Sequence, residues 1–281
     1  MTSIARPAAQ LDRPASPARP PASPIKPTGT ARQGLFATRR PDAWWIEPTI
    51  VAIGFGAFIL YSLFSSLIWE PVFHVPYEAQ GYLSPFFSPL IKPDWLPWWF
   101  SPAILILWIP LGFRTTCYYY RKAYYRAYFV DPPACAVGEP TIHSRYRLEA
   151  AFPFILQNIH RYFLYLAFIP LFFLWLDAFL ALRQEGVWRI GVIGAVMFLN
   201  VALLTGYSLS CHSFRHVIGG KMDCFSCSRG ALLRYRAWER ATWLNIHHLR
   251  WAWASLISVA VTDLLIRLLA IGVIGDPALR F

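Results

Sequence analysis

The stretch that decides the fold runs from residue 190 to residue 227 and reads IGVIGAVMFLNVALLTGYSLS followed by CHSFRHVIGGKMDCFSC. Its first part is apolar and has the ~20 residues that an α-helix needs to cross the hydrocarbon core of a bilayer. Its second part gathers three of the five cysteines and two of the seven histidines where the apolar run stops. Thiolates and imidazoles are ligands of metal and redox centres, so the stretch predicts a membrane helix that ends at such a centre.

The composition of the whole chain supports a membrane protein. Of its 281 residues, 56% are hydrophobic and only 15% are charged, which is outside the usual range of soluble domains. The net charge of +11 does not indicate a nucleic-acid partner, because the basic residues lie between the apolar runs, where orientation in a membrane explains them. Five unevenly placed cysteines do not form a disulfide framework, which favours reduced thiols or metal ligation.

Five apolar segments predict an all-α integral membrane protein with a bundle of five transmembrane helices. Residues 1–42 are rich in Pro, Ala, Ser and Arg and lack apolar periodicity, so they predict a disordered basic tail without a cleaved signal peptide. Residues 43–281 are then one membrane domain. Its helices are expected at about 49–69, 102–119, 162–182, 190–216 and 252–274.

The basic residues predict the orientation of this bundle. The tail to residue 48, the loop 114–161 and the loop 212–251 each carry seven Lys or Arg, whereas the loop 70–100 carries only Lys92. By the positive-inside rule, the N-terminus and both basic loops are cytoplasmic and the C-terminus is outside. The chain is therefore expected to be a multi-pass protein of the cytoplasmic membrane.

Candidate ligands gather at the predicted cytoplasmic end of the fourth helix. His212 and His216 lie one turn apart on nearly the same face, and Cys211 is about a quarter turn from His212. Gly219 and Gly220 end the helix and let the chain bring Cys224 and Cys227 back toward it. These residues favour a metal or redox cofactor over simple packing.

Histidines at two other helix ends share this membrane face. His160 precedes the third segment, and His247 and His248 precede the fifth. Cys117 and Cys135, taken singly, are expected to be small apolar fillers.

Three charged residues lie within apolar segments: Asp177, Asp263 and Arg267. Such residues are costly in hydrocarbon and face a bundle interior or each other. Asp263 and Arg267, at i and i+4, can form an ion pair on one helix face, and a proton-pathway role is the alternative.

Two redox cofactors suit the histidines and cysteines. Haem b needs two axial histidines on facing helices, such as His160 or His216 with His248, and leaves the cysteines unused. A Rieske-type [2Fe–2S] cluster needs two thiolates and two imidazoles and accounts for more of these residues. A third possibility, from another class, is an ion transporter or channel that uses the intramembrane charges.

Several segments resemble the membrane-anchor subunit (cytochrome b, or C-type, subunit) of the actinobacterial type of succinate dehydrogenase, a branch of respiratory complex II. They are CHSFRHVIGG (211–220), QNIHRYF (157–163) and WAWASL (251–256) followed by Thr262-Asp263, with YYR (124–126) and DPPAC (131–135) adding to the likeness. The resemblance covers roughly residue 43 to the end of the chain.

This resemblance implies a five-helix anchor that is not catalytic on its own. It implies that a flavoprotein and an iron–sulfur subunit dock on the cytoplasmic face, and that a Rieske-type [2Fe–2S] cluster replaces haem and passes electrons to quinone. Carried over to this sequence, the thiolates are Cys211 and Cys224, and the imidazoles are His216 or His212 with His248. Cys227 is then without a role.

Quinone needs an apolar slot with a few polar groups for its carbonyl oxygens. Gln157, His160 and Arg161, at the start of the third segment, are the residues that we expect to supply them.

Overall fold

The computed structural model describes residues 43, 45–130, 152, 154–184, 187–220 and 224–280. The tail predicted at 1–42 lies outside the described residues. The helical bundle begins at α1 (Ile46–Leu63). The regular elements of the described residues are helices except for five short strands, which confirms the predicted all-α class.

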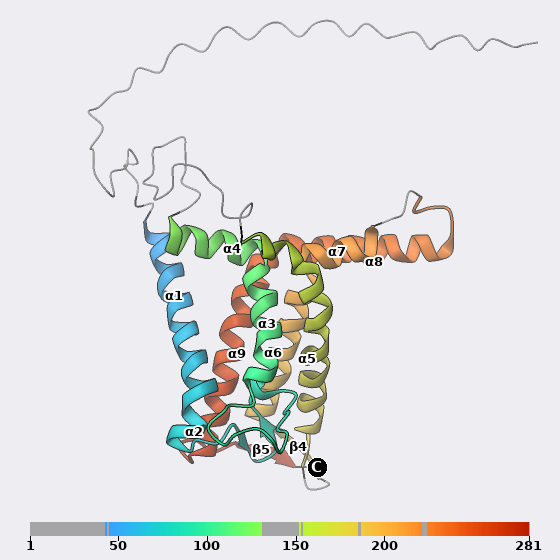
Figure 1. Cartoon of the computed structure of the whole chain (residues 1–281). Helices are drawn as coiled ribbons and strands as arrows, with labels where there is room; N and C mark the ends of the chain where they lie inside the picture. Colours follow the sequence, from blue (N-terminus) through green and yellow to red (C-terminus); the bar gives the residue numbers. More distant parts are fainter. Residues whose placement is uncertain are drawn as a thin grey trace, which may run out of the picture.

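Among the described residues, four helices are long and apolar enough to cross a membrane. The first is α1, which continues through a π-helical turn (Phe64–Ile68) into α2 (Trp69–Phe73). The second is α5 (His160–Leu180), which follows the 3-10 turn η6 (Phe154–Ile159). The other two are α6 (Val192–Leu209) and α9 (His248–Ala270). They run side by side as one bundle (Figure 1). This chain is therefore a multi-pass membrane protein.

The second predicted helix is shorter than expected. α3 (Ile104–Thr116) has 13 residues and is about 20 Å long, less than a hydrocarbon core. It still lies inside the bundle (Figure 1), packed against α5. The structure thus has four candidate spans and one shorter apolar helix where five full crossings were predicted.

The chain changes direction sharply at two cysteines, each of which lies between two helices. Cys117 (φ −64°, ψ 131°) ends α3, and Cys211 (φ −63°, ψ 138°) ends the turn after α6, both in extended backbone. The chain then continues as α4 (Tyr118–Tyr124) and α7 (His212–Gly219), which lie across the end of the bundle in Figure 1. The single helix predicted for 190–216 is therefore two helices at different angles.

We call the end of the bundle that carries α4 and α7 the inner end, following the predicted topology. There α4 leads into a π-helical turn (Tyr125–Phe129), and α7 packs against α8 (Arg229–Ile246) as an arm that projects sideways from the bundle (Figure 1). Asn245 of α8 donates a hydrogen bond to the carbonyl of Ser210, which ties the arm to the corner between α6 and α7.

The opposite, outer end is closed by short strands and turns. β1 (Glu78–Ala79) pairs with β2 (Tyr82–Leu83), and a 3-10 turn (Pro85–Phe87) follows. β3 (Arg183–Gln184), β4 (Val187–Gly191) and β5 (Ala278–Arg280) form an antiparallel sheet that joins the α5–α6 connection to the C-terminal segment.

A buried ion pair holds the outer end to α9, as the i and i+4 spacing of its members predicted. Arg267 Nε lies 3.4 Å from Asp263 Oδ1, and both side chains are fully buried. Asp263 also accepts hydrogen bonds from the hydroxyls of Tyr61, Ser65 and Ser84. Arg267 donates to the carbonyl oxygens of Val75 and Ser65, so the pair connects α9 to the chain around α2.

Candidate cofactor site

Two cysteines and two histidines meet at the inner end of the bundle, each from a different helix end. His160 Nε2 lies 3.1 Å from Cys211 Sγ, and His248 Nε2 lies 3.4 Å from Cys117 Sγ. Cys117, Cys211 and His248 are at most 2% exposed, and His160 is half-buried. We call these four residues the inner quartet.

Hydroxyl groups fix which nitrogen of each imidazole faces its cysteine. Thr116 Oγ1 lies 2.7 Å from His160 Nδ1 and already donates its proton to the carbonyl of Gly112 at 2.6 Å. Ser210 Oγ lies 2.6 Å from His248 Nδ1 and donates to the carbonyl of Tyr207. Each hydroxyl therefore accepts the Nδ1–H of its histidine, and the lone pair of each Nε2 is left facing a sulfur.

The buried surroundings of the two sulfur atoms keep the thiols neutral unless a cation binds them. Burial raises the pKa of the Cys211 thiol to about 11 and also raises the pKa of Cys117. Backbone N–H groups of the following turn point at each sulfur and act in the opposite direction, from Ser213 and Phe214 for Cys211 and from Tyr119 and Tyr120 for Cys117. Without a cation these thiols stay protonated, and a bound metal ion would deprotonate them.

The quartet is not arranged around a single metal ion. Within the described ranges, no group of three or more His, Cys, Asp or Glu side chains could hold one ion. A binuclear iron–sulfur cluster makes a different demand, because each of its two irons takes only two protein ligands. Two cysteines and two histidines at one helix-end layer are the donor set that a Rieske-type cluster requires.

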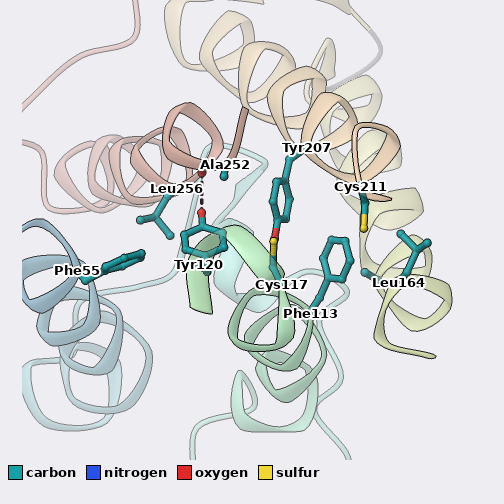
Figure 2. Close-up of a cluster of buried hydrophobic side chains, with 10 residues drawn as sticks. Phe55, Phe113, Cys117, Tyr120, Leu164, Tyr207, Cys211, Ala252 and Leu256 are labelled. Atoms are coloured by element: carbon teal, nitrogen blue, oxygen red, sulfur yellow. Dashed lines mark hydrogen bonds between the residues drawn. The ribbon is translucent and has the colours of Figure 1, made fainter. Parts of the chain in front are cut away.

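Two aromatic rings separate the imidazoles from the middle of the bundle. His160 stacks on Phe113 with ring centres 5.0 Å apart, and His248 stacks on Tyr207 at 5.1 Å. Phe113 and Tyr207 also contact each other at 5.2 Å. Figure 2 shows the Tyr207 hydroxyl directed at the sulfur of Cys117 and the Phe113 ring beside it.

A largely apolar cavity of about 400 Å³ lies on the other side of these rings. Phe113, Arg114 and Tyr207 line it toward the inner end, and Ser62, Ser66 and Ser88 line it toward the outer end. Its walls come from α1, α3, α5, α6 and α9. Four lining residues of α1 and α3 are also exposed on the lipid-facing surface, so the cavity opens sideways between these helices: Ile59, Leu63, Trp108 and Leu111. We call it the lateral cavity.

The structure brings together some of the predicted metal ligands and not others. Cys211 and His248 belong to the inner quartet. Cys224 forms a disulfide with Cys227 beside the arm, and His212 and His216 contact each other through their Nε2 atoms at 3.0 Å on the exposed side of α7. Their recorded contacts do not reach the quartet.

The contacts of Cys117 with His248 and of His160 with Cys211 were not predicted from the sequence. Cys117 was expected to be a filler, yet it lies at the end of an apolar segment on the same predicted membrane side as His160, Cys211 and His248. That shared position, rather than closeness along the sequence, is the signal that could have found it.

The residues predicted to bind quinone, Gln157, His160 and Arg161, do not line the lateral cavity. Gln157 accepts from Arg121 Nη1 at 3.5 Å and from the Tyr125 hydroxyl, and it donates to the Tyr124 hydroxyl at 2.7 Å. Arg161 is exposed. Neither residue lines the lateral cavity, and His160 faces Cys211.

Comparisons with known proteins agree with this architecture. The family model described as actinobacterial succinate dehydrogenase subunit SdhC matches residues 46–272. A chain of the solved Mycobacterium smegmatis Sdh1 complex in the apo form is similar, with 38% sequence identity and a TM-score of 0.73. The match covers 84% of this chain and 92% of that chain. No curated protein matches. The chain belongs to the family of actinobacterial succinate dehydrogenase membrane subunits, SdhC.

Proposed function

We propose that this membrane subunit anchors a succinate dehydrogenase complex and carries electrons from its iron–sulfur subunit to quinone through a Rieske-type [2Fe–2S] cluster. The observation that carries the proposal is the inner quartet. Its two sulfurs and two imidazole nitrogens come from four helix ends that are far apart in the sequence, at 117, 160, 211 and 248.

We assign Cys117 and Cys211 as the ligands of one iron, and His160 and His248 as the ligands of the other. The assignment keeps Cys211 and His248 from the sequence prediction and replaces Cys224 and His212 or His216. When bound, the cluster supplies one-electron transfer at a potential that imidazole ligands raise above that of all-cysteine clusters. Thr116 and Ser210 hold the two rings in the ligating tautomer, a role that outer hydrogen-bond partners commonly have at metal sites.

The lateral cavity is the quinone site in this proposal. Its apolar walls suit a ring and an isoprenoid tail, and its opening between α1 and α3 lets such a molecule enter from the bilayer. Phe113 and Tyr207 form its wall toward the quartet, so a bound ring lies one aromatic layer away from the two imidazoles.

The soluble partners are proposed to dock on the inner end. α4 and the α7–α8 arm lie there and carry Lys and Arg side chains, and by the positive-inside rule this end is cytoplasmic. A flavoprotein and an iron–sulfur subunit on this side would place their electron donor above the quartet. The anchor itself supplies no succinate chemistry, so activity requires the whole complex.

Electron paramagnetic resonance on the purified complex, with iron and acid-labile sulfide analysis, tests the assignment. Cys117→Ser and His160→Ala are expected to remove the Rieske-type signal and quinone reduction, while succinate oxidation with a soluble dye continues. Cys224→Ser and His212→Ala are the matched controls and should retain both. Loss of the signal in the controls, with retention in Cys117→Ser, would restore the set predicted from the sequence.

A haem b anchor is the competing redox proposal and makes a different spectral prediction. It requires sharp Soret and α bands in the purified complex, and it gives the cysteines no part. The contacts of both Nε2 atoms with thiols favour the iron–sulfur assignment.

A further inference from the structure

One carboxylate lies between the lateral cavity and the outer surface. Asp177 is in the last turn of α5, inside an apolar segment where a charged group is costly and commonly functional. Its Oδ2 accepts a hydrogen bond from Ser88 Oγ at 2.5 Å. Ser88 is 1% exposed and lines the lateral cavity, so one hydrogen bond connects Asp177 to the cavity wall.

A polar hollow of about 490 Å³ lies at the outer end. Glu70, His74, Tyr77 and Glu78 are among the residues that line it. The Glu78 carboxylate is close enough to Asp177 for their charges to interact. Asp177 lines neither space itself, but it is half-buried, bonds to Ser88 of the lateral cavity and interacts by charge with Glu78 of the hollow.

The neighbouring intramembrane acid, Asp263, is bound differently. It accepts three hydroxyl hydrogen bonds and forms an ion pair with the Arg267 guanidinium. In the described part of the chain, Asp177 has one such donor, Ser88, and no cation within ion-pair distance. Asp177 can gain and lose a proton without breaking an ion pair.

Two further hydroxyls face the cavity from α1 and the turn that follows it. Ser62 Oγ and Ser66 Oγ are buried, have no hydrogen-bond partner among the described residues and line the lateral cavity. A buried hydroxyl without a partner costs free energy, so these two groups indicate an acceptor that binds there. The carbonyl oxygens of a quinone are such acceptors.

We propose that Asp177 and Ser88 deliver protons from the outer face to a quinone in the lateral cavity, an inference that rests on the proposed function. Quinone becomes quinol by taking up two electrons, which the iron–sulfur donor supplies, and two protons. For each proton, the Asp177 carboxyl gives its proton to Ser88 Oγ while the Ser88 hydroxyl gives its own to the quinone oxygen. The Asp177 carboxylate then takes up the next proton from water in the outer hollow.

Substitutions in the whole complex test this relay. Asp177→Asn is expected to lower kcat for quinone reduction by roughly 10²-fold, the lower part of the range for a lost general acid, with an unchanged KM for quinone. Ser88→Ala should have the same effect, and Asp177→Glu should restore most of the rate. Asp94→Asn removes an exposed carboxylate of the same outer connection and is the matched control.

Two readouts separate this inference from the proposed function. Dye reduction by succinate and the iron–sulfur signal should be normal in Asp177→Asn, which shows that the complex is assembled. Infrared difference spectra of the wild type on quinone reduction should contain a carboxyl band that Asp177→Asn removes. A wild-type rate in both Asp177→Asn and Ser88→Ala overturns the relay alone, whereas a wild-type complex without an iron–sulfur signal overturns the proposed function.

Discussion

Replacing Arg267 with leucine is expected to destabilise the bundle strongly. The guanidinium and its partner Asp263 are both fully buried, and removing one member of a buried pair typically costs about 3–5 kcal/mol because the other charge is left uncompensated. Arg267→Leu also leaves the carbonyl oxygens of Val75 and Ser65 without this donor. At about 2–4 °C per kcal/mol, the melting temperature should fall by roughly 6–20 °C.

Thermal unfolding of the purified complex in one detergent measures this effect. Arg183→Leu removes an exposed arginine at the same end of the bundle and should change the unfolding free energy by at most about 0.5 kcal/mol. The double variant Asp263→Leu/Arg267→Leu should be more stable than Arg267→Leu, since no charge is left unpaired.

This structural role would be refuted if Arg267→Leu lowers the melting temperature by less than about 2 °C and yet abolishes quinone reduction. It would instead favour the pair as part of an ion path, the use that a transporter or channel would make of it.

Three other predictions concern the inner end. Thr116→Val and Ser210→Ala remove the hydroxyl partners of the Nδ1 atoms of His160 and His248. Each variant should weaken metal retention by about 10–100-fold, measured as iron lost to a chelator. If both variants retain iron as well as the wild type, the assignment of the tautomers is wrong. Gly112→Ala would bring its Cβ into overlap with the ring of Phe163, so that this ring or the two helices must shift. The variant should lower the melting temperature and broaden the iron–sulfur signal, and an unchanged spectrum would argue against close packing of α3 and α5. Cys224→Ser, which removes the disulfide with Cys227, should leave iron content unchanged, and loss of iron in this variant would place that cysteine at the metal after all.

The helical class and most of the bundle could be predicted from length and hydropathy. Four of the five predicted segments coincide with helices able to span a membrane, because an apolar run of ~20 residues has few other stable structures in lipid. The corners at Cys117 and Cys211 could not be predicted, since neither position carries the Pro or Gly that ordinarily signals the end of a helix. The tertiary structure, not local propensity, bends the chain there.

The set of residues that meet at the inner end was predicted only in part, for a related reason. Closeness along the sequence selected His212, His216 and Cys224, which follow Cys211 within a few turns. The corner at Cys211 changes the direction of the chain, so α7 carries both histidines away from the bundle. Cys117 lies almost a hundred residues earlier, and its sulfur reaches His248 only because the corner between α3 and α4 lies beside the start of α9.

The sideways opening of the lateral cavity has a consequence for how strongly small molecules inhibit this protein. A compound that enters between α1 and α3 comes from the lipid phase, so its partition coefficient multiplies the concentration that the site experiences. Apparent potency quoted per volume of buffer will therefore vary with the amount of membrane or detergent in the assay. Compounds ranked in detergent need to be ranked again in vesicles, on a mole fraction scale, before their head groups can be compared.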